Sequence, residues 1–150
     1  MSLAGCEPAG TAAGNAELEV LGATESWIQS GDYVLHFNAL KTDQLDPDIA
    51  SNYNIVRSRN RAMLNVSILR QEPNGAMTAV PGNVTATAVN LTGQLKNLLI
   101  REIREGSAIY YIAETPIVSG ESLIFTVDAI PESEDEAIRV RFQKQFYVEQ

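Results

Sequence analysis

The stretch Leu91–Glu114, LTGQLKNLLIREIREGSAIYYIAE, decides the predicted fold. Its second half contains the β-branched and aromatic run IYYI, which suits a pleated, half-buried surface better than a helix. Gly106, at the centre of Glu105–Ser107, can adopt the positive φ that a tight connection needs. Pro116 ends the run, because proline cannot donate to a strand ladder. We therefore predict two long strands that fold back on each other about Glu105–Ser107.

The first of these two strands, Leu95–Glu105, is apolar on both parities near its start and charged near its end. Such a strand is expected to be covered on both faces at its start and solvated at the turn. A helix over the same residues is the competing interpretation, because short apolar runs discriminate poorly between the two structures.

The composition indicates one globular domain. The chain has 150 residues, of which 45% are hydrophobic, and this is enough to bury a core without disulfides or metals. A net charge of −8 and a pI near 4.6 argue against nucleic acid as a partner. No stretch approaches the ~20 apolar residues of a transmembrane helix. The single cysteine, Cys6, excludes an internal disulfide framework and a multi-cysteine metal site, and we expect no cofactor.

The first residues of the chain resemble a lipoprotein processing site. Leu3-Ala4-Gly5-Cys6 is similar to the lipobox at which bacterial signal peptides are cut, which leaves a lipidated cysteine. Met1-Ser2-Leu3 has the character of an added start, so whether Leu3 is native stays open. We predict a flexible, Gly/Ala/Thr/Pro-rich tether up to residue 17 and one β-sandwich domain over residues 18–150. Membrane contact is expected only through lipid on Cys6; the alternative is a free cysteine in a disordered tail.

Alternating and β-rich patterns predict most of the remaining elements. The predicted strands are Tyr33–Asn38, Ala62–Leu69, Met77–Val80, Asn83–Leu91, Glu121–Ile130 and Ala137–Val148, with an edge strand or turn at Leu18–Gly22. Asp46 as N-cap and Pro47 at the first helical position predict a short helical turn, which we expect to carry the chain between sheets. The all-β pattern indicates an antiparallel immunoglobulin-like β-sandwich of seven to eight strands with that one helical turn. A closed barrel is the alternative.

Arginines dominate the candidate binding site. Arg57, Arg59 and Arg61 have period two and, if extended, point to one side, where they could bind a carboxylate, a phosphate or an acidic loop. The full set of candidate binding residues is Arg57, Arg59, Arg61, Arg101, Arg104, Tyr110 and Tyr111. The alternative, which we favour in so acidic a chain, is that the arginines pair internally with Glu102, Glu105 or Glu114.

No catalytic or metal-binding pattern is recognisable. His36 is the single histidine, and because metal sites and triads need companions we predict an ordinary strand residue. The acidic run Glu132–Glu136 lacks the spacing of a calcium loop and is expected to be a solvated turn. We therefore expect a protein that is not an enzyme. A hydrolase of envelope glycan that acts through Glu102, Glu105 or Glu114 is an alternative.

Four segments resemble a known family. They are GDYVLHFNAL at Gly31–Leu40, NIVRSRNRAMLNVSILR at Asn54–Arg70, the Leu91–Glu114 stretch and FTVDAIP at Phe125–Pro131. They are similar to a family of secreted or periplasmic bacterial proteins catalogued as a domain of unknown function, the one numbered four-four-two-six. The likeness runs from Trp27 to the C-terminus, with its most specific pieces at Val56–Arg61 and Arg101–Glu114.

The resemblance implies a β-sandwich of the bacterial cell envelope with no established activity. We expect a non-catalytic binding or interaction module whose partner is an envelope protein or a small anionic ligand, with its oligomeric state left open. An assembly factor that offers a sheet edge to an extended client strand is a further alternative.

Overall fold

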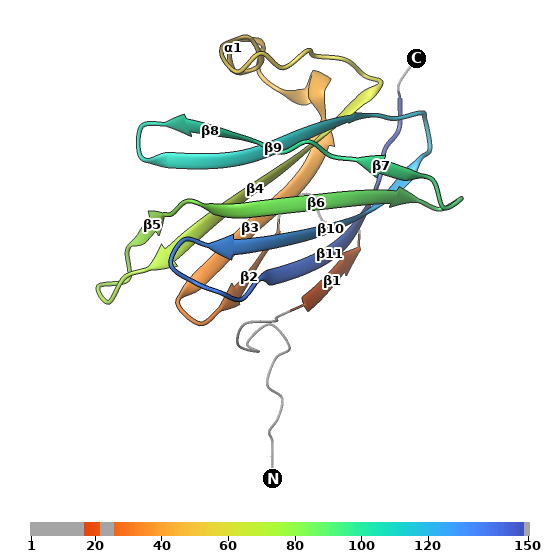
Figure 1. Ribbon diagram of the computed structural model, residues 1–150. Coiled ribbons are helices and arrows are strands. Elements are labelled where there is room, and N and C mark those ends of the chain that lie inside the picture. Colours follow the sequence, from red (N-terminus) through yellow and green to blue (C-terminus); the bar gives the residue numbers. More distant parts are fainter. Residues whose placement is uncertain (1–16, 22–25, 149–150) are drawn as a thin grey trace.

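Two β-sheets pack face to face in the computed structural model, which describes residues 17–21 and 26–148 (Figure 1). Sheet A has the order β1 (Glu17–Leu21), β11 (Ile138–Gln145), β10 (Ser122–Pro131), β6 (Gly82–Asn90) and β7 (Leu95–Asn97). Sheet B has the order β2 (Ser26–Ser30), β3 (Tyr33–Lys41), β4 (Arg61–Gln71), β9 (Ala108–Pro116) and β8 (Arg101–Glu105), and β5 (Met77–Ala79) pairs with β4. A short 3₁₀ turn (Thr42–Gln44) and α1 (Pro47–Asn52) lie between β3 and β4.

The predicted immunoglobulin-like sandwich is confirmed. Among the described strands, every pair is antiparallel except β1 with β11. The described part of the chain holds eleven strands rather than seven to eight, because the short edge strands are separate elements. None of the helices in residues 17–21 and 26–148 is long and apolar enough to cross a membrane.

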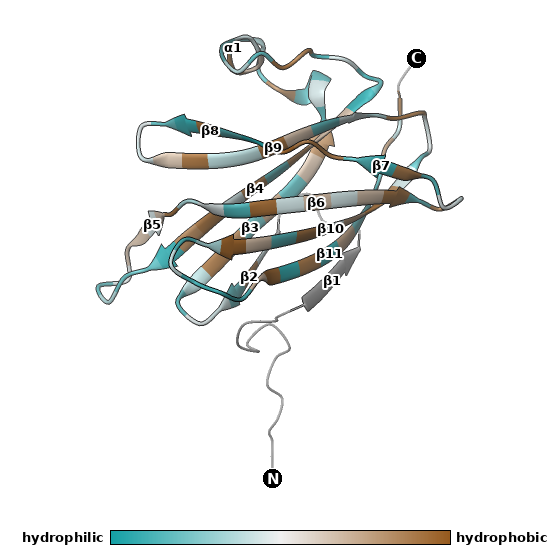
Figure 2. Ribbon diagram, viewed as in Figure 1, coloured by the Kyte–Doolittle hydropathy of each residue, from teal (hydrophilic) through white to brown (hydrophobic). Residues whose placement is uncertain are grey.

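Alternating residues of the two sheets form the core. Figure 2 shows hydrophobic and hydrophilic residues alternating along β10 and β11, as expected for strands with one face on a core. Phe37 of sheet B packs against Phe142 of sheet A with ring centroids 4.9 Å apart, and Phe142 stacks on Phe125 at 5.0 Å. All three rings are buried, and the contact between Phe37 and Phe142 joins the two sheets.

The long strand predicted over Leu95–Glu105 is wrong in one respect. β7 pairs with β6 in sheet A, whereas β8 pairs with β9 in sheet B, so the chain changes sheets between them. Leu98 is buried at this crossing and Leu99 is 87% exposed. The run is apolar on both parities because it passes from one sheet to the other, and not because a strand is covered on both faces. The hairpin of β8 and β9 about Gly106, with φ of 59°, is confirmed.

Helix α1 begins as predicted, but the two strands that it connects belong to one sheet and not to two. The Asp46 side chain accepts a hydrogen bond from the Asp48 backbone N at 2.8 Å, and Pro47 occupies the first helical position. The helix joins β3 to β4, which are neighbours in sheet B, so it does not carry the chain between sheets. It packs instead on the outer face of sheet B, where Ala50 contributes to a small apolar cluster with Met63.

The chain crosses from sheet B to sheet A between β5 and β6, at Gly82. A Cβ at this position would lie 2.4 Å from the Ile130 carbonyl oxygen and 2.8 Å from Ile68 Cδ1. The Gly82 backbone N donates to the Tyr111 hydroxyl at 2.9 Å. Any side chain therefore collides with the backbone of β10 at the point where the two sheets approach each other.

We expect Gly82→Ala to lower the free energy of unfolding by about 1–3 kcal/mol, because the added carbon cannot fit without moving β10. Urea denaturation of the purified domain measures this change. Asn83→Ala alters the next, exposed residue and serves as the control. Equal stability of both variants would show that the crossing has room for a side chain.

Candidate functional site

One edge of β4 changes its partner along its length. β3 occupies the other edge from Ala62 to Arg70, so β9 and β5 must share the remaining edge. β9 pairs with Arg61–Val66 and β5 pairs with Leu69–Gln71. Beyond Val66, β9 leaves β4, and its residues Ala108–Tyr110 pair only with β8. The sheet is therefore split at this point, and the split is hollow.

We call this hollow the notch. It has a volume of about 260 Å³ and its lining comes from four strands. The lining residues are His36, Phe37 and Asn38 of β3, Asn65, Ser67 and Leu69 of β4, Ala79 of β5, and Ala108, Ile109 and Tyr110 of β9.

The floor of the notch is polar. His36 lies opposite Ser67, and Asn38 lies opposite Asn65, in the pairing of β3 with β4. Residues directly opposite each other in a sheet project to the same face, so these four side chains form one group on the outer face of sheet B. Trp27 lies opposite His36 at the edge and is 58% exposed, which places a large aromatic ring beside this group.

A second, mostly apolar hollow adjoins the notch beneath the helical segment, and we call it the α1 hollow. Its volume is about 280 Å³. It is lined by Leu45, Ile49, Tyr53, Ile55, Met63, Asn65, Ile103, Glu105, Tyr110 and Ile112. Asn65 and Tyr110 line both hollows, so a polar and an apolar depression meet at these two residues.

Asn65 has an unusual environment at this junction. Its side-chain oxygen, Oδ1, is buried and has no hydrogen-bond partner; within residues 17–21 and 26–148, Asp43 Oδ1 is the other side-chain atom in this condition. A buried acceptor without a partner costs about 1–3 kcal/mol, and such groups in native structures often mark a functional site. The position is therefore one at which a hydrogen-bond donor from outside would be stabilising.

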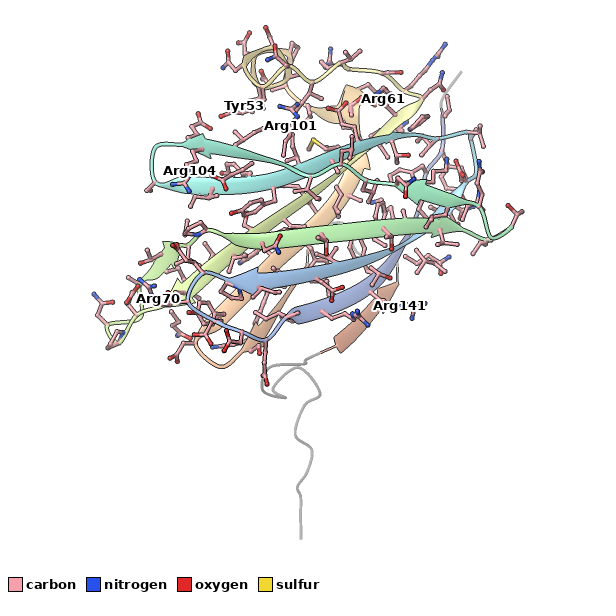
Figure 3. All side chains as sticks on the ribbon, viewed as in Figure 1. Tyr53, Arg61, Arg70, Arg101, Arg104 and Arg141 are labelled. Carbon is pink, nitrogen blue, oxygen red and sulfur yellow. The ribbon has the colours of Figure 1, made fainter. Side chains whose placement is uncertain are left out.

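Tyr53 and Glu105 meet at the mouth of the α1 hollow. The Tyr53 hydroxyl donates to Glu105 Oε1, and this hydrogen bond raises the pKa of Tyr53 to about 12. Arg101 Nη2 donates to the Tyr53 carbonyl oxygen at 2.7 Å and so holds the end of α1 against β8. Figure 3 shows Tyr53 and Arg101 next to each other between α1 and the β8–β9 hairpin.

The predicted row of arginines does not form, because Arg57 and Arg59 lie in the loop before β4 and only Arg61 is in a strand. Arg57 donates to the carbonyl oxygens of Leu45 at 2.9 Å and Asp43 at 2.8 Å. These bonds fasten the loop to the segment before α1.

Internal pairing with glutamates is confirmed for Arg61, Arg101 and Arg104. Arg61 and Arg101 both approach Glu114, at 3.4 and 3.5 Å. Arg104 pairs with Glu102. A binding role for the arginines stays a prediction, and in this structure Arg61 and Arg101 join their segments to β9 through Glu114, whereas Arg104 pairs within β8.

The candidate residues of β8 and β9 are divided between the two faces of sheet B. Tyr110 lines both hollows on the outer face. Tyr111 points into the core, is 4% exposed, and donates its hydroxyl hydrogen to Glu102 Oε1. Arg104 lies opposite Ile109, on the inner face of sheet B, and Arg101 lies opposite Ile112, on the outer face. The structure therefore places Tyr110 and Arg101, but not Tyr111 and Arg104, on the face with the hollows.

The three glutamates of the hydrolase alternative all make contacts with neighbouring side chains. The Arg104 hydrogen bond holds the pKa of Glu102 below its ordinary value despite partial desolvation, and the Tyr111 hydroxyl adds to this effect. A general acid in glycoside hydrolysis needs a raised pKa, so the direction at Glu102 is the opposite one. Glu105 and Glu114 are engaged by Tyr53 and by two arginines, respectively.

The sequence predicted no functional role for Trp27, Asn38, Asn65 or Ser67, and it predicted His36 to be an ordinary strand residue. The available signal was a polar residue at alternate positions of two strands that are otherwise apolar. Which alternate residues face each other depends on strand pairing, and that information is not local. In the part of the chain that the structure describes, no three His, Cys, Asp or Glu side chains gather into a metal-binding group. Cys6 and the predicted tether lie outside the described residues.

Comparison with known proteins identifies relatives of this chain. The model of the DUF4426 family, described as a domain of unknown function, matches residues 28–149. A crystal structure of a DUF4426 family protein from Pseudomonas aeruginosa PAO1 is 30% identical, with 85% of this chain and 98% of that chain covered and a TM-score of 0.72. Among curated proteins, none matches the chain.

More distant likenesses show the fold alone. FetP of uropathogenic Escherichia coli strain F11, recombinantly expressed in the periplasm, is 15% identical, with 86% of this chain and 100% of that chain covered and a TM-score of 0.59. A copper-bound variant of FetP is 12% identical, with 85% and 92% covered and a TM-score of 0.57.

The hydrogen bond between Tyr53 and Glu105 predicts a pH effect. Because the folded pKa of about 12 lies above the ordinary value of 10.0, the stability from this bond is fully present below pH 10 and is lost as the pH rises to 12. We expect Glu105→Gln to move the Tyr53 pKa back towards 10, as measured by NMR of the tyrosine ring carbons. Glu134→Gln, which removes the carboxylate that accepts from Tyr33, is the control and should leave Tyr53 unchanged.

Proposed function

We propose a function for this chain, which belongs to the DUF4426 family: it is a non-catalytic binding module of the bacterial cell envelope that takes a small ligand on the outer face of sheet B. The family membership rests on the match over residues 28–149 and agrees with the resemblance that the sequence segments indicated. The binding function rests on the geometry of the notch and the α1 hollow.

The observation that carries the proposal is the unpartnered Oδ1 of Asn65. A polar atom buried without a partner lowers stability, and replacing it by an apolar group would remove this cost. A ligand that donates a hydrogen bond there would offset the cost only when bound. Ligand sites are typically concave and mostly apolar with a few well-placed polar groups, and the two adjoining hollows have this composition.

Two observations support an envelope location. The lipobox-like Leu3–Cys6 and the tether that follows it suit a domain held at a membrane surface by lipid. FetP, whose fold is similar, was expressed in the periplasm.

The copper of the FetP variant does not fit the donors of this site. Copper favours imidazole, thiolate and thioether ligands. The notch offers the single imidazole of His36, together with amide and hydroxyl groups of Asn38, Asn65 and Ser67, and the α1 hollow adds one thioether, Met63. One imidazole and one thioether are fewer soft donors than a copper centre normally uses. We therefore propose an organic ligand for this face.

The alternative of an assembly factor that lends a sheet edge receives less support. Along β8, four of five residues are charged, and charged edges resist strand addition. In β7, Lys96 turns inward to Glu121 at 2.9 Å, and both side chains are largely buried. Inward-pointing charges on an edge strand have the same protective effect.

We expect Asn65→Leu to raise the free energy of unfolding by about 1 kcal/mol, because it removes the unpartnered acceptor, and to abolish ligand binding. Urea denaturation measures the first effect. Asn97→Leu, at an exposed position of β7, is the matched control and should stabilise nothing.

Two-dimensional amide NMR of the β-sandwich domain tests binding. The panel of compounds contains small amines, carboxylates, sugars and dipeptides. Shifts confined to Ser67, Asn65 and Ala108–Tyr110 in the unmodified protein, and absent in Asn65→Leu, support the proposal. If no compound of the panel perturbs these residues, or if Asn65→Leu binds equally well, the outer face of sheet B is not a ligand site.

The lipid anchor predicts a modified cysteine. The natural gene, with its own signal region, is expressed in a bacterium, and the mass of the N-terminal peptide and the membrane partition of the protein are measured. We expect a diacyl or triacyl mass on Cys6 and recovery with membranes. Cys6→Ser is the control and should be recovered in the soluble fraction. An unmodified cysteine in a soluble protein would exclude the anchor.

A further inference from the structure

We propose that the ligand of this face is a small organic amine, whose protonated nitrogen is bound by the Glu105 carboxylate beside Tyr53 and whose apolar body fills the α1 hollow. This inference rests on the proposed binding function and specifies the chemical class of the ligand.

Two groups that line the hollows, the Glu105 carboxylate and the Asn65 side-chain oxygen, are hydrogen-bond acceptors. Glu105 is the one acidic or basic residue apart from His36 among the residues that line the notch and the α1 hollow. Asn65 Oδ1 is an acceptor that lacks a donor. An ammonium group carries three N–H donors and no acceptor, so it complements this arrangement better than any other simple head group.

Aromatic rings flank the same acceptors. Tyr53 and Tyr110 both line the α1 hollow with Glu105 and Asn65. A cation near the face of a tyrosine ring is attracted by its quadrupole, and the attraction grows when the cation is partly removed from water. Two tyrosines beside a carboxylate are therefore suited to a cation rather than to a neutral or anionic group.

The aliphatic side chains of the α1 hollow indicate that the ligand has an apolar body. Leu45, Ile49, Ile55, Met63, Ile103 and Ile112 supply aliphatic walls. Ile49 is 47% exposed, so part of this apolar surface faces solvent in the free protein. Covering such surface with an aliphatic or aromatic body is favourable in proportion to the area removed from water. The ligand is thus an amine with an apolar body, and not a simple ammonium ion.

An anionic ligand meets unfavourable conditions here. A carboxylate placed beside Tyr53 in the α1 hollow would face the Glu105 carboxylate, so two anionic groups would oppose each other. The nearby guanidinium of Arg101 is engaged by the carbonyl oxygens of Tyr53 and Asn54 and by Glu114. The net charge of −8 adds a general attraction for cations. The anionic ligand expected from the arginine pattern would therefore need to displace existing contacts.

Three compounds of matched size separate these possibilities. Phenethylamine, phenethyl alcohol and phenylpropanoate share a phenyl ring and a two-carbon chain and differ in a cationic, neutral or anionic head. Each is titrated into the protein at pH 7, with Trp27 fluorescence and amide NMR shifts of β4 and β9 as readouts. We expect phenethylamine to bind at least tenfold more tightly than phenylpropanoate, with the alcohol between them.

Variants locate the contribution of the charge. Glu105→Gln should weaken phenethylamine about tenfold and leave phenethyl alcohol unchanged, because only the charged head loses its counter-charge. Glu134→Gln is the matched control, since Glu134 is likewise an exposed carboxylate that accepts from a tyrosine hydroxyl, at 3.1 Å from Tyr33. It should change neither affinity.

The outcomes distinguish this inference from the proposed function. If phenylpropanoate binds as tightly as phenethylamine, or if Glu105→Gln leaves the amine unaffected, the amine class is wrong. Binding of other compounds at Asn65 and Ser67 would then leave the binding function in place. If no compound of either set perturbs these residues, both proposals fail.

Discussion

The edge of β4 that faces away from β3 can pair with only one strand at each position, and it pairs with two strands in succession. This constraint shapes the rest of sheet B. β9 must leave β4 before β5 can pair with it. After β5 the chain crosses to sheet A at Gly82, where a side chain has no room. The notch is the space left by the exchange of partners. A sandwich in which β9 followed β4 to its end would have a continuous sheet and no notch there.

The segment between β3 and β4 turns this opening into a two-part site. Arg57 bonds the loop to the carbonyl oxygens before α1, and Arg101 bonds the end of α1 to β8. Thr42 adds a reciprocal pair of hydrogen bonds with the backbone of Ser58, at 2.8 and 3.0 Å. These contacts hold an apolar cover over one half of the outer face and leave the polar half open. The basic residues of an acidic protein thus contribute by positioning the cover.

The two faces of sheet B differ in how completely their groups are satisfied. The inner face carries the buried Phe37, which packs against sheet A, and its neighbours are apolar. The outer face carries His36, Asn38 and Ser67 in the middle of the sheet and an asparagine oxygen without a partner. Polar residues are ordinary on the outer face of a sandwich, whereas a buried oxygen without a hydrogen-bond partner is not. Proteins commonly depart from locally consistent choices at functional sites, and the Asn65 oxygen is such a departure within the surface that we propose for binding.

The sequence by itself determined the class of the fold, the positions of most strands, the start of α1 at Asp46 and Pro47, the hairpin about Gly106 and the family. Each depends on period, capping or turn chemistry, which act over a few residues. Only the tertiary structure decided that Leu95–Glu105 divides between two sheets, that α1 covers sheet B, and that His36 and Asn65 belong to one site. Strand pairing sets these features, because it joins residues far apart in the chain through backbone hydrogen bonds that carry no mark in local sequence.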